Sequence, residues 1–121
     1  MIDINNIRSG WLELQIGNRV FTVSYLTDVA KTLEKIFAGN LKSYFAKVLY
    51  FDGEGSELYL TCRKEYDDII ILWEEYTRED AITLDRFEFN YEEFHKEWLK
   101  LWNEIKDDYD KNFTFRHGDN E

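Results

Sequence analysis

The sequence has no proline and a single cysteine, Cys62, among its 121 residues. Without proline, the turns must be formed by glycine, asparagine, aspartate and serine, which accept or stabilise turn conformations. One cysteine excludes a disulfide within the chain and is typical of a protein in a reducing compartment. Because Cys62 alternates with Leu58 and Leu60, we predict a small buried side chain rather than a nucleophile.

Long apolar runs are also missing. The longest one, Ile69 to Trp73, is far shorter than the segment that a membrane-spanning helix requires. The first six residues contain neither a basic region nor an apolar stretch, so we expect no signal peptide. These features predict a cytoplasmic protein that does not bind membranes.

No motif in the chain identifies a reaction. The two histidines, His95 and His117, are distant from each other and from the cysteine, so no zinc-ligand or nucleophile–base pattern is present. The acidic, glycine-containing segment 52–57 lacks the length of an EF-hand loop and is interpreted as a tight turn. The carboxylates at 92–97 and 107–110 are expected on the solvated face of a helix. We therefore predict a protein with no metal or cofactor that is not an enzyme.

The residues that are present favour one folded domain. Hydrophobic residues make up 44% of the chain and aromatic residues 17%, unlike the composition of a disordered acidic protein. A chain of this length can bury about two thirds of its surface without disulfides or metals. We expect residues 1–121 to form a single domain, with 113–121 as a frayed tail.

Alternating apolar residues predict several antiparallel strands. Residues 11–16 and 19–25 are joined by a Gly-Asn pair and predict a tight hairpin. Further strands are expected at 44–51, 57–63, 68–74 and 81–89. In the last of these strands, the apolar alternation changes phase: Ile82 and Leu84 point to one side, and Phe87 and Phe89 point to the other. A β-bulge or an exposed aromatic pair would explain this change.

Two helices are expected. The first begins at Thr27 or Asp28 and ends near Ala38, before a Gly-Asn pair. The second runs from Asn90, a capping residue, to about 112, with apolar residues at helical spacing. The predicted fold class is therefore α+β: an antiparallel sheet in the order ββαββββα, with a short helix and a long C-terminal helix packed on one face.

Negative charge is concentrated in the second half of the chain. Residues 1–63 contain seven acids and seven bases, which leaves 18 of the 25 acids and 8 of the 15 bases for residues 64–121 and accounts for the net charge of −10. Such concentrated like charge opposes compaction, and a basic partner would offset that repulsion. An acidic chain is poorly suited to direct nucleic-acid binding.

The segment from Glu74 to Asp80 and the strand after it interleave acids with aromatic residues, as binding hot spots do. The alternative is an ordinary solvated loop and edge strand. The residues predicted to bind a partner are Glu74, Glu75, Tyr76, Glu79, Asp80, Asp85, Phe87 and Glu88.

Two stretches, Phe21-Thr-Val-Ser-Tyr-Leu-Thr-Asp28 and Val48-Leu-Tyr-Phe-Asp-Gly-Glu-Gly-Ser-Glu-Leu-Tyr-Leu60, carry a resemblance. Over residues 11–75 the chain resembles small bacterial immunity proteins of polymorphic toxin systems, a group that includes contact-dependent growth inhibition. The resemblance implies a small cytoplasmic protein that binds and neutralises a cognate toxin domain, often a basic nuclease. It supplies no catalytic residues.

Three other functions remain open. A phage-type nucleic-acid mimic that inhibits a host defence protein would use the same negative charge. A self-associating module, at most a weak homodimer, would pair Phe87 and Phe89 of an edge strand across a two-fold axis. An enzyme would need a deep pocket that holds His95 and two carboxylates.

Overall fold

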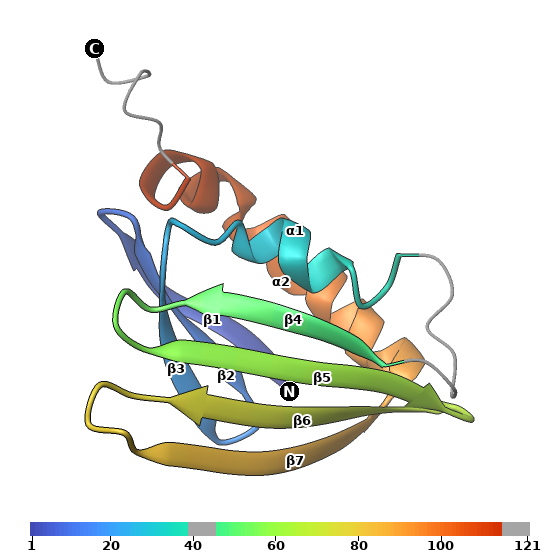
Figure 1. The fold of residues 1–121 in the computed structure, drawn as a ribbon. Coiled ribbons are helices and arrows are strands. Elements are labelled where there is room, and N and C mark those ends of the chain that lie inside the picture. The colour runs from blue at the N-terminus through green and yellow to red at the C-terminus, as the bar shows by residue number, and fades with distance from the viewer. Residues whose placement is uncertain (39–45, 115–121) are drawn as a thin grey trace.

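A computed structural model describes residues 1–38 and 46–114 (Figure 1). Strands β1, β2 and β3 come first, followed by helix α1, strands β4 to β7 and helix α2. Their bounds are β1 Ile2–Arg8, β2 Trp11–Ile16, β3 Arg19–Ser24, α1 Val29–Glu34, β4 Lys47–Asp52, β5 Glu57–Glu65, β6 Asp68–Tyr76, β7 Ile82–Asn90 and α2 Tyr91–Asn112. The predicted α+β class, with antiparallel strands, a short helix and a long C-terminal helix, is confirmed.

The strands form two antiparallel sheets, one in the order β1-β2-β3 and the other in the order β4-β5-β6-β7. Strand β1 is an addition to the predicted order. It pairs with β2 through Ile2 opposite Ile16 and Ile4 opposite Leu14. Its alternation involves only two apolar residues before an Asn-Asn pair, which is too short a pattern to predict a strand.

One hydrophobic core lies between the sheets and the helices. It contains Leu12, Leu14 and Ile16 from β2 together with side chains of β4 to β6 and of both helices. Cys62 belongs to this core and is fully buried, as the sequence predicted. Burial raises the pKa of its thiol to about 12, so the reactive thiolate is disfavoured at neutral pH.

Helix α1 is shorter than predicted. Asp28 caps it by accepting a hydrogen bond from the Lys31 amide at 3.2 Å. After Glu34 the chain continues in turns to Ala38, and the predicted end at Gly39-Asn40 lies outside the described residues, as do Tyr44 and Phe45 of the predicted next strand.

Helix α2 agrees with its prediction. Asn90 accepts a hydrogen bond from the Glu93 amide at 3.0 Å, and Phe94, Trp98 and Tyr109 are buried. The helix ends against Phe113, which is also buried. Phe113 was expected in a frayed tail, so the predicted start of that tail is wrong; residues 115–121 lie outside the described part of the chain.

The Tyr109 hydroxyl ties α2 to the start of α1. It accepts a hydrogen bond from the Ala30 amide and donates one to the Asp28 carboxylate, both at 2.9 Å. Burial raises the pKa of this phenol, so it stays protonated and able to donate over the normal pH range. One side chain therefore joins two helices far apart in the sequence.

Strand β7 corrects the prediction of a bulge or an exposed aromatic pair. Its pairing with β6 has no register shift, and its residues alternate regularly. Phe87 and Phe89 face the core, whereas Ile82 and Leu84 are 60% and 67% exposed on the other side. Both explanations were wrong because they assumed that the aliphatic pair was the buried one.

The β2–β3 hairpin closes over the inner side of β7. Gly17 at its turn has a φ of +58°, and a Cβ atom there would lie 2.5 Å from a ring carbon of Phe87. Position 17 therefore requires glycine for two reasons: the backbone has a positive φ, and the Phe87 ring leaves no space for a Cβ atom.

We expect the substitution Gly17→Ala to lower the free energy of unfolding by about 1–3 kcal/mol, through backbone strain and displacement of the Phe87 ring. Urea unfolding followed by circular dichroism measures this change. In a Phe87→Leu background, where the ring edge is removed, the same substitution should cost less. An equal cost in both backgrounds would contradict the contact with Phe87.

Candidate functional site

The four-stranded sheet has one covered and one open face. The three-stranded sheet lies behind it in Figure 1, and no helix or strand of residues 1–38 and 46–114 lies over the side toward the viewer. Apolar side chains on this open face remain accessible: Val48 of β4 is 63% exposed and Leu84 of β7 is 67% exposed. An uncovered sheet face with exposed apolar groups is a surface on which a partner can dock.

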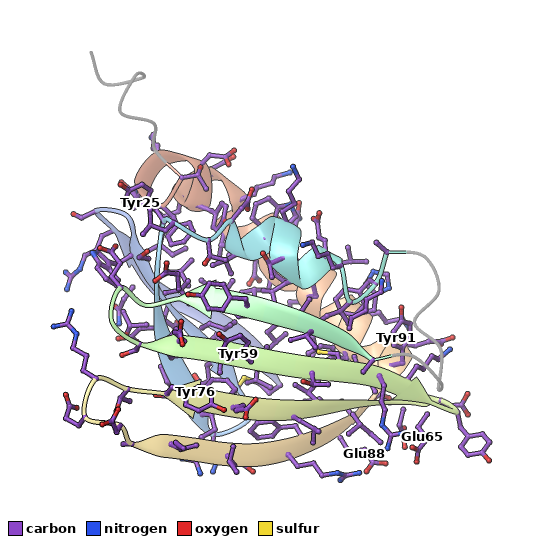
Figure 2. The ribbon with its side chains drawn as sticks, viewed as in Figure 1. Tyr25, Tyr59, Glu65, Tyr76, Glu88 and Tyr91 are labelled. Atoms are coloured by element: carbon purple, nitrogen blue, oxygen red, sulfur yellow. The ribbon has the colours of Figure 1, made fainter. Side chains whose placement is uncertain are left out.

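Three tyrosines line up across the open face. Tyr50 of β4 lies directly opposite Tyr59 of β5, with ring centroids 5.3 Å apart. Tyr76 of β6 follows, 6.0 Å from Tyr59 and nearly perpendicular to it. Figure 2 shows Tyr59 and Tyr76 on adjacent strands of this face. We call this surface, with Glu57 and Glu74 beside the rings, the tyrosine face.

Carboxylates surround these rings. Glu74 lies opposite Tyr59, and Glu57 lies opposite Tyr76. The Tyr76 hydroxyl donates a hydrogen bond to the Glu74 carboxylate, and this bond, together with burial, raises the pKa of Tyr76. The pKa of Tyr50 is also raised, by burial first and then by the nearby charges of Asp52 and Glu57. Both phenols are protonated at neutral pH and sit in a strongly negative field.

Basic side chains do not neutralise this end of the sheet. Within residues 1–38 and 46–114, the ion pairs of the structure are Met1–Glu97, Arg19–Asp85, Arg63–Glu65 and Arg86–Glu88. None of them includes Glu57 or Glu74.

The opposite end of the same face is different. There Arg63 pairs with Glu65 at 2.8 Å, and Arg86 pairs with Glu88 at 3.3 Å. Glu65 and Glu88 are labelled at that end in Figure 2. Burial and the neighbouring Glu88 raise the pKa of Asp68 at this end. Ion pairs therefore compensate Glu65 and Glu88 at this end, whereas no ion pair of the described residues includes Glu57 or Glu74 at the end that carries the tyrosines.

A hollow of about 590 Å³ lies where this end of the face meets the β4–β5 and β6–β7 turns. We call it the turn hollow. Its polar walls are formed by four carboxylates and two phenols: Asp52, Glu54, Glu57, Asp80, Tyr50 and Tyr76. No lysine or arginine of the described residues lines it. Arg78 crosses between the two turns and donates a hydrogen bond to the Glu54 carbonyl at 2.8 Å, so it holds the walls together.

The structure separates the eight residues that the sequence predicted as a binding site. Glu74 and Tyr76 belong to the tyrosine face, Asp80 lines the turn hollow and Glu79 is exposed in the same turn. Glu88 lies at the opposite, charge-paired end of the open face. The other three predicted residues are Glu75, Asp85 and Phe87, and they point toward the covered side of the sheet.

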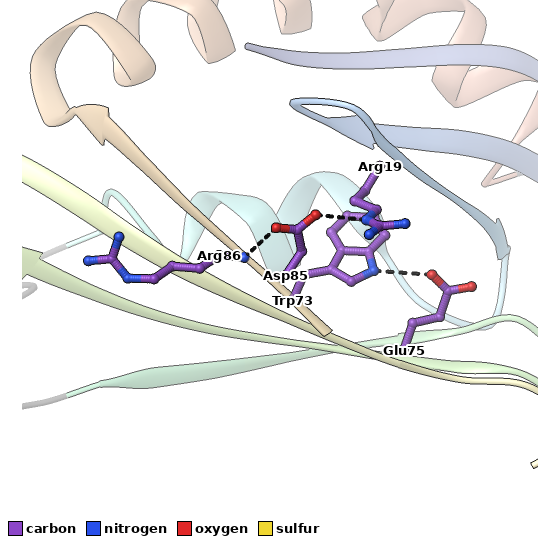
Figure 3. A network of polar contacts seen from close by, with 5 residues as sticks. All are labelled: Arg19, Trp73, Glu75, Asp85 and Arg86. Atoms are coloured by element: carbon purple, nitrogen blue, oxygen red, sulfur yellow. Dashed lines mark hydrogen bonds and ion pairs between the residues drawn. The ribbon is translucent and has the colours of Figure 1, made fainter. Parts of the chain in front are cut away.

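Two of these inward residues contact the three-stranded sheet or its hairpin, Asp85 through Arg19 and Phe87 through Gly17, whereas the contact of Glu75 lies within β6. Figure 3 shows the polar contacts of Asp85 and Glu75. Asp85 of β7 accepts a hydrogen bond from Arg19 of β3 at 2.8 Å, and this contact lowers the pKa of Asp85. Glu75 accepts a hydrogen bond from the Trp73 indole at 3.1 Å. Phe87 packs edge-to-face on the same indole with centroids 6.4 Å apart. Their positions suit a structural role between the sheets.

Four residues of this surface were not predicted from the sequence: Tyr50, Asp52, Glu57 and Tyr59. They alternate with buried residues of β4 and β5, so their side chains share the open face. The alternation of these residues with buried ones is visible in the sequence. They were not predicted because residues 52–57 were interpreted only as a turn and because residues 1–63 carry no net charge.

The exposed rings and carboxylates of this face form a surface that is suited to binding. Within the described residues, no group of three or more histidine, cysteine or acidic side chains could hold a metal ion. His95 stacks on Phe37 with ring centroids 4.3 Å apart, and His117 lies outside the described residues. In the described part of the chain, neither helix has the length and hydrophobicity needed to cross a bilayer.

Comparison with known proteins identifies no relative: no family model, no curated protein and no solved structure matches this chain.

The Arg19–Asp85 ion pair makes the stability of the protein dependent on pH. A carboxyl group whose pKa is lowered by folding stabilises the protein above its unfolded pKa of about 3.9, and this stabilisation is lost as the pH falls through the folded value. We therefore expect Arg19→Gln to lower the free energy of unfolding at pH 7 and to have much less effect at pH 3.

Urea unfolding at both pH values tests this expectation. Arg86→Gln is the matched control, because it removes the same charge from an exposed surface pair that contributes little to stability. Equal destabilisation by Arg19→Gln at pH 7 and pH 3 would show that the ion pair with Asp85 is not the cause.

Proposed function

We propose that this protein binds a basic protein domain through its tyrosine face and thereby neutralises it, as an immunity protein neutralises a cognate toxin. The observation that carries this proposal is an open sheet face on which three contacting tyrosines lie among carboxylates that form no ion pair within the described residues. The resemblance to immunity proteins over residues 11–75 suggests the kind of partner, a toxin domain such as a nuclease.

The chemistry of the tyrosine face supports binding of a cationic surface. Tyrosine supplies a large, rigid contact area at a small entropic cost and is enriched at interface hot spots. Unpaired carboxylates accelerate the encounter with a positively charged partner, and close charge pairs formed in the complex add affinity. A nuclease that binds phosphate groups presents such a positive surface. It would act on nucleic acid in the cytoplasm, which is where we place this protein.

The alternatives have weaker support. The self-association surface of Phe87 and Phe89 is not available, because both rings pack inward against the core. A nucleic-acid mimic needs negative charge distributed like a phosphate backbone. Here the unpaired carboxylates at the tyrosine face are gathered at one end of a single sheet and interrupted by tyrosine rings, which favours docking on a protein.

Capture with the tagged protein from its native host, followed by mass spectrometry, supplies the partner for the test. We expect a basic domain that stops the growth of cells and is tolerated when this protein is co-expressed. The double reversal Glu57→Lys with Glu74→Lys should weaken binding by about 100-fold or more, because it replaces attraction by repulsion at the centre of the contact. Calorimetry measures the dissociation constant, and growth measures neutralisation.

The matched control is Glu104→Lys with Asp107→Lys, which makes the same change in net charge on the exposed side of α2. It should preserve binding and protection. If both double variants lose protection to the same extent, the effect is one of net charge, and the tyrosine face is not the binding site.

A further inference from the structure

The turn hollow differs from the rest of the open face in ways that indicate a specific occupant. It is more enclosed than the shallow hollow that Glu57, Tyr59, Glu74 and Tyr76 form on the sheet beside it, and its volume of about 590 Å³ lies within the range of sites that accept small ligands. Its four carboxylates come from both halves of the chain. Asp52, Glu54 and Glu57 lie in or beside the β4–β5 turn, and Asp80 lies in the β6–β7 turn.

The carboxylates of the hollow are not satisfied by cations of the protein itself. Asp52 accepts a hydrogen bond from the Glu54 amide at 2.7 Å, which fixes its position. The nearest arginine, Arg78, directs its guanidinium to the Glu54 carbonyl and makes no ion pair with any carboxylate of the described residues. The carboxylates of the hollow therefore have no ion-pair partner among the described residues, although the Arg78 guanidinium lies beside Gly55 at its edge.

Aromatic walls add a second requirement. Tyr50 and Tyr76 line the hollow together with the carboxylates. A lysine ammonium is compact and strongly hydrated, so it gains less from contact with a ring face than a guanidinium does. A guanidinium is flat and weakly hydrated, and it can stack on an aromatic ring while its edge donates paired hydrogen bonds to a carboxylate.

We propose that the turn hollow binds an arginine side chain of the basic partner, with the guanidinium between the tyrosine rings and the carboxylates of Asp52, Glu57 and Asp80. This inference rests on the proposed function, since it assumes that a protein docks on the adjacent tyrosine face. It goes further by assigning the residue type that is recognised and the place where it binds.

Two synthetic peptides test the proposal without knowledge of the partner. Each has three basic residues separated by glycine, arginine in one and lysine in the other. Titration into the ¹⁵N-labelled protein at low salt gives both the dissociation constants and the amide signals that move. We expect the arginine peptide to bind about two- to fivefold more tightly and to shift the signals of Gly55, Ser56 and Ala81.

Matched variants separate the ring from the charge. Tyr76→Leu removes the ring and should abolish the preference for arginine while net charge is unchanged. Tyr76→Phe keeps the ring and should retain the preference. Asp80→Asn should weaken binding of both peptides, whereas Asp107→Asn on α2 should have little effect.

Equal dissociation constants for the two peptides, or moving signals on α2 rather than around the turn hollow, would overturn the proposal. That result would not affect the proposed function, which is judged separately by neutralisation and by the Glu57→Lys, Glu74→Lys variant. Conversely, an arginine preference at the hollow in a protein that protects against no toxin would support the inference and contradict the proposed function.

Discussion

The inner face of the four-stranded sheet is the surface against which the three-stranded sheet and both helices bury their apolar side chains. Leu60, Cys62 and Trp73 on that face have almost no exposure, and they belong to the same core cluster as Leu14 and Trp98 from the other layers. Because successive residues of a strand point to opposite sides, this one-sided burial fixes what the opposite side presents to solvent. The residues of the tyrosine face are those that alternate with the buried ones along β4, β5 and β6.

The contact between the β2–β3 hairpin and β7 determines which of the predicted binding residues are available. Gly17 lies against Phe87, and Arg19 pairs with Asp85, so the inward residues of β7 are used to hold the two sheets together. A side chain that packs between the two sheets is not available to contact a partner. Because neighbouring residues of a strand point to opposite faces, aromatic and acidic residues that are adjacent in the sequence lie either between the sheets or on the open face.

The sequence predicted the elements with a strong period and missed those that depend on three-dimensional context. The apolar stripe of α2 and the Gly-Asn hairpin are local patterns, and both were found in the structure. Strand β1 was missed because Ile2 and Ile4 gain their stability from pairing with β2, a contact between separate segments. The phase change in β7 was misinterpreted because both of its faces carry apolar residues, and only the position of the hairpin shows which face is covered.

Charge was informative along the chain but not sufficient to locate the site. The excess of acids after residue 63 indicated a basic partner and drew attention to the segment from Glu74 to Asp80. In three dimensions, Asp52, Glu54 and Glu57 from the neutral half of the chain join that segment at one end of the sheet. The relevant grouping depends on strand pairing, which brings Glu57 opposite Tyr76.

The arrangement of like charges across the strands opposes folding. Asp52 and Glu57 lie directly opposite each other on β4 and β5, and such pairs destabilise a sheet. At the other end of the same face, arginines are placed beside Glu65 and Glu88, so this sheet can accommodate compensating cations. A surface determined by stability alone would have such cations at both ends. The end that carries the tyrosines has no such ion pairs among the described residues, which agrees with the proposed function, in which a basic partner supplies the cations on binding.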